Sequence, residues 1–167
     1  RERGDRAPGV TVAGPHHDGP EDFGVLLSTA YVAFTETLDA GLEAAGFGDF
    51  DRWYGFVLRA VADDELSLRE LADRLEMSSP GALKIVTAME RAGYLERRRS
   101  PQDRRLRLVA ATERGRSALA TARSLHRAFE QRLARGEGAD AVRAARAVLT
   151  AAVDQGSGRV PRLFRST

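Results

Sequence analysis

The chain has 167 residues, of which 43% are hydrophobic and 30% charged, and its formal net charge is +2. This length and apolar content suit one domain with a buried core rather than a disordered chain, and the lack of cysteine excludes disulfides, thiolate catalysis and thiol-based redox sensing. Because no apolar run approaches the roughly 20 residues of a membrane-spanning helix, and the N-terminus lacks the apolar region of a secretory signal, we expect a soluble, cytoplasmic protein.

Two helices are predicted in the first third of the chain. Apolar residues recur at intervals of three and four from Phe23 to Leu42, which is typical of a long amphipathic helix, and Gly46 is placed to end it. Asp51 can cap a second, shorter helix. The preceding residues 1–20 contain four Gly and three Pro without apolar periodicity, so we predict a disordered N-terminal arm.

The next two helices have clear start signals. The segment from Ser67 to Glu70 is a capping box, in which the Ser hydroxyl and the Glu carboxylate each accept a hydrogen bond from the backbone of the other residue. Ser78 or Ser79 can cap the following helix, whose first turn holds Pro80, where the missing N–H costs nothing. These two helices form the predicted helix-turn-helix pair.

A hairpin and two long helices complete the chain. Short extended runs at residues 94–99 and 106–110 flank the turn-rich segment 100–104, which predicts a two-stranded hairpin. Thr112 can cap a long helix, and a break around Gly136 precedes a last amphipathic helix. This order of elements is that of a winged helix-turn-helix, so the expected fold is mostly α with a small β-hairpin wing.

Positive charge is concentrated around the hairpin. Between Arg91 and Arg116 the sequence has nine Arg and three acidic residues, a net charge of +6, whereas the whole chain is only +2 and everything else therefore sums to −4. This segregation of sign is the pattern expected of a protein that presents one face to a polyanion such as duplex DNA. A solvated hairpin face without a partner is the alternative interpretation.

Three motifs together resemble the MarR family of bacterial transcription regulators. They are the run of residues 71–97, the wing sequence Pro101-Gln-Asp-Arg-Arg105, and Thr112-Glu-Arg-Gly115 at the start of the long helix. The resemblance implies a triangular homodimer, held together by the N- and C-terminal helices, that presents one winged unit to each half of a pseudo-palindromic operator. Long amphipathic helices at both ends of the chain independently need a surface to cover them.

The resemblance covers roughly residues 24–154 and divides the chain into three parts. We expect a disordered arm at residues 1–20, a MarR-like domain at residues 21–155 and a C-terminal tail at residues 156–167. Within the domain, the winged helix-turn-helix spans about residues 51–110, and the dimerisation helices span about residues 21–46 and 112–155.

The candidate DNA-contacting residues come from two elements. In a helix-turn-helix the N-terminal residues of the second helix meet base edges in the major groove, and here these are Ser78, Ser79, Pro80, Gly81, Leu83 and Lys84. On the wing, the side chains expected to reach phosphates and the minor groove are Arg98, Arg99, Arg104 and Arg105. Asp103 is unfavourable beside phosphate, and the resemblance implies that it stabilises the wing by pairing with Arg105. Helix capping alone is the alternative role of Ser78 and Ser79.

The resemblance also implies a small-molecule effector. MarR-like proteins often bind small aromatic or phenolic ligands in a crevice between the dimer helices and the winged unit. The aromatic residues able to line such a pocket here are Tyr31, Phe34, Trp53, Tyr54 and Phe56. Their helical spacing fits an ordinary hydrophobic core equally well, which is the alternative interpretation.

The expected function is therefore that of a sequence-specific DNA-binding transcription regulator, acting as a homodimeric repressor. An enzyme is disfavoured because His16, His17 and His126 form no metal-ligand pattern and no glycine-rich phosphate loop precedes a helix, and no cofactor or metal is expected. The alternative is a winged-helix module for protein association without sequence-specific DNA binding. That alternative is favoured by Gly81, which stands where the family often places a side chain able to touch DNA.

Overall fold

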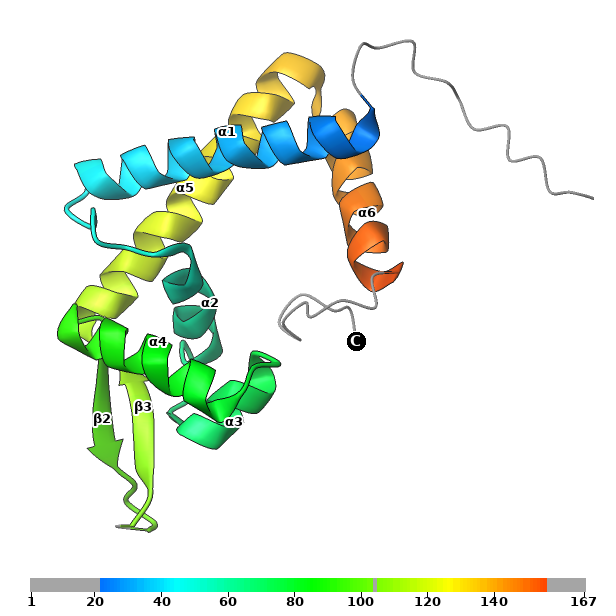
Figure 1. Ribbon diagram of the computed structural model, residues 1–167. Helices are drawn as coiled ribbons and strands as arrows, with labels where there is room; N and C mark the ends of the chain where they lie inside the picture. The colour runs from blue at the N-terminus through cyan, green and yellow to red at the C-terminus, as the bar shows by residue number, and fades with distance from the viewer. Residues whose placement is uncertain (1–21, 104, 156–167) are drawn as a thin grey trace, which may run out of the picture.

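The computed structural model describes residues 22–103 and 105–155. Its elements in chain order are α1 (Phe23–Ala44), α2 (Arg52–Ala60), β1 (Leu66–Ser67), α3 (Leu68–Arg74), α4 (Ser79–Arg91), β2 (Leu95–Arg99), β3 (Arg107–Ala111), α5 (Glu113–Glu137) and α6 (Ala139–Gln155) (Figure 1). The chain is mostly helical with a small antiparallel sheet, which confirms the predicted fold class. The predicted arm at residues 1–20, the tail at residues 156–167 and Arg104 lie outside the described residues.

Most helices begin at a side chain that accepts a hydrogen bond from the backbone of the first turn. These N-caps are Asp22, Asp51, Ser67, Ser78 and Thr112. The capping box predicted at the start of α3 is formed, with both reciprocal hydrogen bonds present. Caps of this kind satisfy N–H groups that the helix itself leaves unpaired, and each depends on one short polar side chain. This local chemistry explains why the helix starts are evident in the sequence.

The sheet has three strands rather than the two that the sequence predicts. Its order is β1-β3-β2, with both neighbouring pairs antiparallel. The predicted hairpin pairs β2 with β3 from Leu95↔Ala111 at its base to Arg99↔Arg107 near its tip. The additional strand is the two-residue β1, in which Leu66 pairs with Val109. The pairing ties the segment before α3 to the wing.

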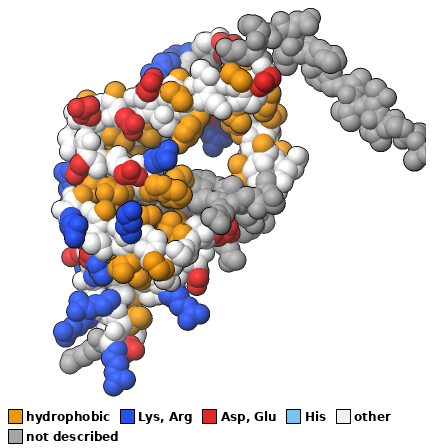
Figure 2. Space-filling model, viewed as in Figure 1, with side chains coloured by type: hydrophobic (Ala, Val, Ile, Leu, Met, Phe, Trp, Pro, Cys, Tyr) orange, Lys and Arg blue, Asp and Glu red, His pale blue; other side chains and the backbone are white. Residues whose placement is uncertain are grey.

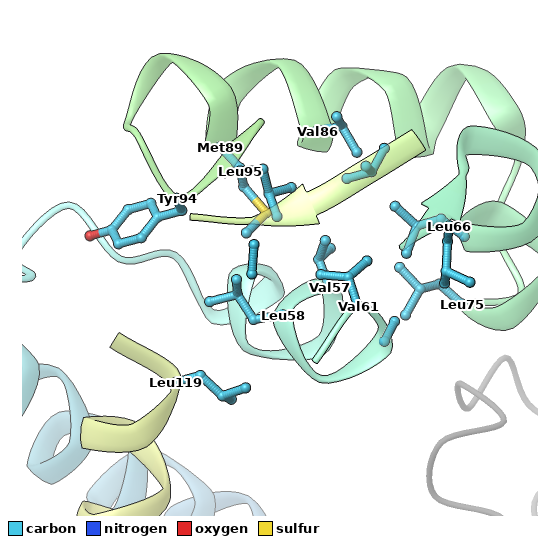
Figure 3. Packing of buried hydrophobic residues seen from close by; sticks show 14 of the residues in the cluster. Val57, Leu58, Val61, Leu66, Leu75, Val86, Met89, Tyr94, Leu95 and Leu119 are labelled. Atoms are coloured by element: carbon cyan, nitrogen blue, oxygen red, sulfur yellow. The ribbon is translucent and has the colours of Figure 1, made fainter. Parts of the chain in front are cut away.

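The hydrophobic core lies between α2, α3, α4 and the sheet (Figure 3). Its largest fully buried side chains are those of Tyr94, Leu58, Leu71, Met89, Val57, Val86 and Val109. Helix α5 adds Ala118 and Leu119 to this core from its N-terminal part. The core therefore makes α2 to β3 and the first turns of α5 one packed body, and we call its part from α2 to β3 the winged unit (residues 52–111).

The long helices extend away from the winged unit. In Figure 1, α1 crosses α5 above the winged unit, and α6 turns back from the far end of α5 after the left-handed residue Gly138. Helix α6 has no buried residue, and α1 buries only Leu42. No helix within residues 22–103 and 105–155 is both long and apolar enough to cross a membrane.

Candidate nucleic-acid interface

The start of α4 separates the roles of two adjacent serines. The Ser78 hydroxyl accepts a hydrogen bond from the Gly81 backbone amide at 3.2 Å and is the N-cap of the helix. Ser79 occupies the first helical position and is exposed, as is Pro80. Gly81 is half-buried, with the Ser78 Oγ 3.2 Å from the place a Cβ would occupy. Capping is thus the observed role of Ser78, while Ser79 is exposed to solvent.

The outer face of α4 extends beyond Lys84, the last residue of this helix that the sequence predicts to contact DNA. A shallow surface groove of this helix is lined by Pro80, Leu83, Lys84, Thr87, Ala88 and Arg91. Thr87 and Arg91 follow Lys84 at spacings of three and seven residues, so they continue its helical face toward the C-terminus. The opposite face is the buried one, formed by Ala82, Val86 and Met89. The same periodicity that identified these inward positions could have identified Thr87 and Arg91 from the sequence.

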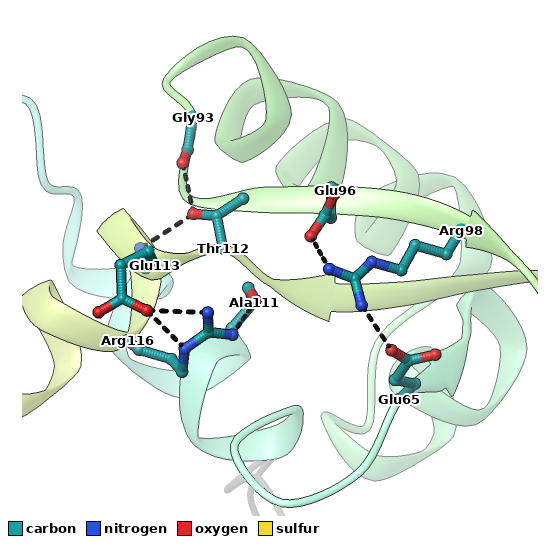
Figure 4. Close-up of polar contacts among 9 residues, drawn as sticks. Glu65, Gly93, Glu96, Arg98, Ala111, Thr112, Glu113 and Arg116 are labelled. Carbon is teal, nitrogen blue, oxygen red and sulfur yellow. Dashed lines mark hydrogen bonds and ion pairs between the residues drawn. The ribbon is translucent and has the colours of Figure 1, made fainter.

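The wing arginines fall into two groups. Arg97 is bound by the Glu90 carboxylate, and this hydrogen bonding raises the pKa of Arg97. Arg98 pairs with Glu96 at 2.5 Å and with Glu65 at 3.4 Å (Figure 4). The second group remains available for phosphate: in the part of the chain that the structure describes, no ion pair involves the exposed side chains of Arg99, Arg105 and Arg107.

The wing tip is organised by two polar side chains. Ser100 is only 4% exposed, and its hydroxyl accepts hydrogen bonds from the backbone amides of Gln102 and Asp103. The Asp103 carboxylate accepts a hydrogen bond of 2.8 Å from the backbone amide of Arg105. Asp103 therefore holds Arg105 through the main chain; among the described residues, no ion pair links their side chains. The wing-stabilising pairing of Asp103 with the Arg105 guanidinium stays a prediction.

The base of the wing is clamped to α5 by Thr112. Its hydroxyl donates to the Gly93 carbonyl at 2.6 Å and accepts from the Gly115 amide at 3.1 Å (Figure 4). Its backbone amide donates to the Tyr94 carbonyl at 3.1 Å. Gly93, with a φ of +76°, makes the left-handed turn that brings the end of α4 to this point. The Thr112-Glu-Arg-Gly115 motif thus fixes where the wing starts relative to α5.

A cavity of about 520 Å³ separates α1 from the winged unit. Figure 2 shows hydrophobic side chains in this hollow, with Lys and Arg side chains gathered around the wing at the other end of the molecule. The cavity is lined by three of the five predicted pocket residues, Tyr31, Phe34 and Phe56, and also by Phe47 and Phe50, which were not predicted from the sequence. Phe47 and Phe50 lie in the loop between α1 and α2, where no helical periodicity marks them.

The other two predicted pocket residues, Trp53 and Tyr54, do not line this cavity. Tyr54 packs against Phe50 and Tyr94 beside the core, and Trp53 is 38% exposed and packs on Phe56. Successive residues of a helix point about 100° apart, so Trp53, Tyr54 and Phe56 on α2 cannot all face one cavity. The cavity-facing positions of α2 are instead Arg52, Gly55, Phe56 and Arg59.

The cavity has a basic side. Arg59 is half-buried, and its guanidinium donates to the Gly55 carbonyl at 3.0 Å. Burial and then the charge of Arg123 lower the pKa of Arg59, while burial and then the charge of Arg59 lower the pKa of His126. Asp39, Glu43 and Asp51 also line the cavity, but within the described ranges none of them pairs with Arg59.

The structure describes no group of three or more His, Asp or Glu residues in residues 22–103 and 105–155 that could hold a metal ion.

Residues 49–106 match the model of the MarR family. Over this segment the chain is similar to MarR-family proteins. The matched segment contains the outer face of α4, β2 and the wing tip, so the candidate DNA-contacting residues predicted from the sequence lie inside it. No curated protein matches the chain.

Solved structures extend the likeness to the long helices. The transcriptional repressor CouR, bound to a 23-mer DNA duplex, is 26% identical with a TM-score of 0.63, over 79% of this chain and 92% of CouR. FabT of Streptococcus pneumoniae in complex with DNA is 20% identical with a TM-score of 0.62, over 79% and 95% of the two chains. MepR of S. aureus, as a DNA complex, is 20% identical with a TM-score of 0.62, over 80% and 97%.

Proposed function

We propose that this chain is a MarR-family, sequence-specific DNA-binding transcription regulator that represses from a pseudo-palindromic operator in the cytoplasm. The observation that supports the proposal is that two exposed surfaces suited to DNA, the outer face of α4 and the wing, belong to the same winged unit. The outer face of α4 offers Ser79, Lys84 and Arg91 to a major groove, and the wing offers Arg99 and Arg105 without internal ion pairs among the described residues. CouR, FabT and MepR, which share this fold, have all been solved with DNA.

We further propose that the protein acts as a homodimer. Large apolar side chains are exposed on all three long helices: Phe23, Val25, Leu26, Leu27, Tyr31 and Val32 on α1, Leu133 on α5, and Val148 and Leu149 on α6. A soluble monomer seldom leaves so much apolar surface to water, and a second copy would cover it with the same elements. Two copies would also supply the two winged units that an inverted repeat requires.

The cavity supports a small aromatic effector as part of this function. Its walls provide aromatic faces from Tyr31, Phe34 and Phe56 beside Arg59, whose charge forms no ion pair within the described residues, so an aromatic ligand with an acidic group would suit it. Such a ligand regulates only if it binds more tightly to a conformation whose winged units are wrongly spaced for the operator. No catalytic role is proposed; CouR, which shares the fold, is a repressor.

The test is selection of duplexes from a random pool by the purified protein at near-physiological salt. We expect enrichment of an inverted repeat with half-site centres about one helical turn apart. Retention of duplexes without an enriched motif would leave only nonspecific phosphate binding and overturn the proposal. In that case the winged unit would have to be tested as a protein-association module, for which none of the comparisons offers support.

A further inference from the structure

Three segments far apart in the sequence meet at the hydroxyl of Tyr94. The Tyr94 hydroxyl donates a hydrogen bond of 2.5 Å to the Asp49 carboxylate, in the loop between α1 and α2. The Arg114 guanidinium, in the first turn of α5, contacts the same carboxylate oxygen at 2.9 Å and the Tyr94 oxygen at 3.1 Å. Burial and the Asp49 hydrogen bond raise the pKa of Tyr94 to about 12. The hydroxyl is therefore a protonated donor at neutral pH.

On one side, Tyr94 contacts the wall of the cavity. Its ring packs edge-on against Phe50 with centroids 5.5 Å apart and lies 6.4 Å from the ring of Phe47. The Arg114 guanidinium lies over both the Tyr94 and Phe47 rings, at 4.7 Å and 5.4 Å from their centroids. Since Phe47 and Phe50 line the cavity, a ligand that displaces either ring also disturbs the packing of Tyr94.

On the other side, Tyr94 is fixed to the root of the wing. It directly precedes β2, and its carbonyl accepts the backbone amide of Thr112. In Figure 3 its ring points from the start of β2 to the edge of the core, while its backbone stays with the strand. The residue is thus too tightly held at its backbone to move without moving β2.

We propose that Asp49, Tyr94 and Arg114 are positioning residues that couple the aromatic wall of the cavity to the wing. The Asp49 carboxylate holds the cavity loop to the Tyr94 hydroxyl, so a shift of the loop changes the position of the wing root. This inference rests on the proposed function, because it assigns the wing to DNA and the cavity to an effector. Coupling between two sites is reciprocal, so DNA bound at the wing must also alter the cavity loop, and no effector is needed to detect it.

The experiment measures hydrogen exchange of the loop at residues 45–51 with and without a saturating amount of the selected operator duplex. The Phe47 and Phe50 amides are useful reporters because they donate to the Leu42 and Phe47 carbonyls. The variant is Tyr94→Phe, which removes only the hydroxyl. Its matched control is Tyr54→Phe, which removes a hydroxyl from the neighbouring ring that packs 5.5 Å from Tyr94.

We expect duplex to slow loop exchange at least about 5-fold in the wild type and in Tyr54→Phe, the lower end of typical coupling between sites. In Tyr94→Phe the slowing should fall below about 2-fold while duplex still saturates the protein. Asp49→Ala, at an exposed position, repeats the test if Tyr94→Phe does not fold. Equal slowing in all variants would overturn the coupling and leave the proposed function intact. Failure of the wild type to bind any duplex would overturn both.

Discussion

Gly115 lies so close to Tyr94 that a Cβ built on Gly115 would stand 2.2 Å from the Tyr94 carbonyl oxygen. The same Cβ would be 3.0 Å from the buried Leu58 side chain, and the Tyr94 carbonyl is backbone, so the closer contact cannot be relieved by a side-chain movement. We therefore expect Gly115→Ala to destabilise the fold by about 1–3 kcal/mol, measured by urea unfolding. Gly136→Ala, in the same helix with nothing within 4 Å, is the control and should be neutral or stabilising by up to about 1 kcal/mol.

The two serines at the start of α4 should respond differently to replacement by alanine. Ser78→Ala removes the N-cap and should cost about 1 kcal/mol of stability. Ser79→Ala removes an exposed hydroxyl and should change stability by less than about 0.5 kcal/mol, while weakening operator binding. Thermal unfolding and duplex titration of both variants separate the roles. Equal duplex affinity for Ser79→Ala and wild type would remove Ser79 from the residues that contact DNA.

Replacement of the wing arginines should alter the salt dependence of DNA binding. We expect Arg104→Ala and Arg105→Ala each to weaken binding to all duplexes and to lower the magnitude of the salt slope by about one unit for each phosphate that is no longer neutralised. Arg143→Ala is the control, since Arg143 pairs with Asp140 on α6, away from the winged unit. A slope equal to that of the wild type would remove the replaced arginine from the interface.

In the free protein Arg98 pairs with two carboxylates that compete with phosphate for its guanidinium. Its closer partner in the free protein is Glu96, on the exposed surface of β2. Glu96→Gln should therefore raise duplex affinity by up to about 5-fold, since exposed ion pairs contribute about 0–1 kcal/mol. Glu113→Gln, which removes the equivalent charge from the Arg116 pair, is the matched control. A fall in affinity for Glu96→Gln would show that the pair orients Arg98 for DNA instead of withholding it.

The raised pKa of Tyr94 predicts a loss of stability at high pH. Burial and then Asp49 raise this pKa to about 12, whereas a tyrosine in an unfolded chain titrates near 10. The contribution to stability is complete below pH 10 and is lost as the pH rises from about 10 to 12, by about 2–3 kcal/mol at most. Urea midpoints between pH 8 and pH 11 should fall more steeply for the wild type than for Tyr94→Phe. Parallel curves would show that the hydroxyl is not buried in this way.

The parts of the fold that local chemistry determines could be predicted from the sequence. Capping side chains, apolar periodicity and a turn-rich tip are each contained in a short segment, and they located the helices and the hairpin. Strand β1 could not be predicted, because two residues carry no periodicity and Leu66 becomes a strand only by pairing with Val109, more than 40 positions later. The Tyr94 cluster was missed for the same reason, since Asp49 and Arg114 are 65 positions apart.

The part of the candidate site that lies on one helix, α4, could be predicted from the sequence. The N-terminal residues of α4 followed from the helix-turn-helix order, but the face of α4 was followed only as far as Lys84. The cavity required the relative orientation of α1, α2 and α5, which no single segment encodes. Phe47 and Phe50 were therefore not predicted, while Trp53 and Tyr54 were assigned to a cavity that they do not line.

The hairpin is buried at its root and exposed near its tip, and this difference in exposure affects how the protein can evolve. Leu95 and Ala111 are buried at the root, whereas Arg99 and Arg107, which pair near the tip, are exposed. Mutations at Arg99 and Arg107 therefore carry little penalty in folding, while those at the root are removed by selection for a stable domain. Over generations these two exposed positions can change toward new operator sequences on an unchanged scaffold, and related regulators should differ there before they differ at the root.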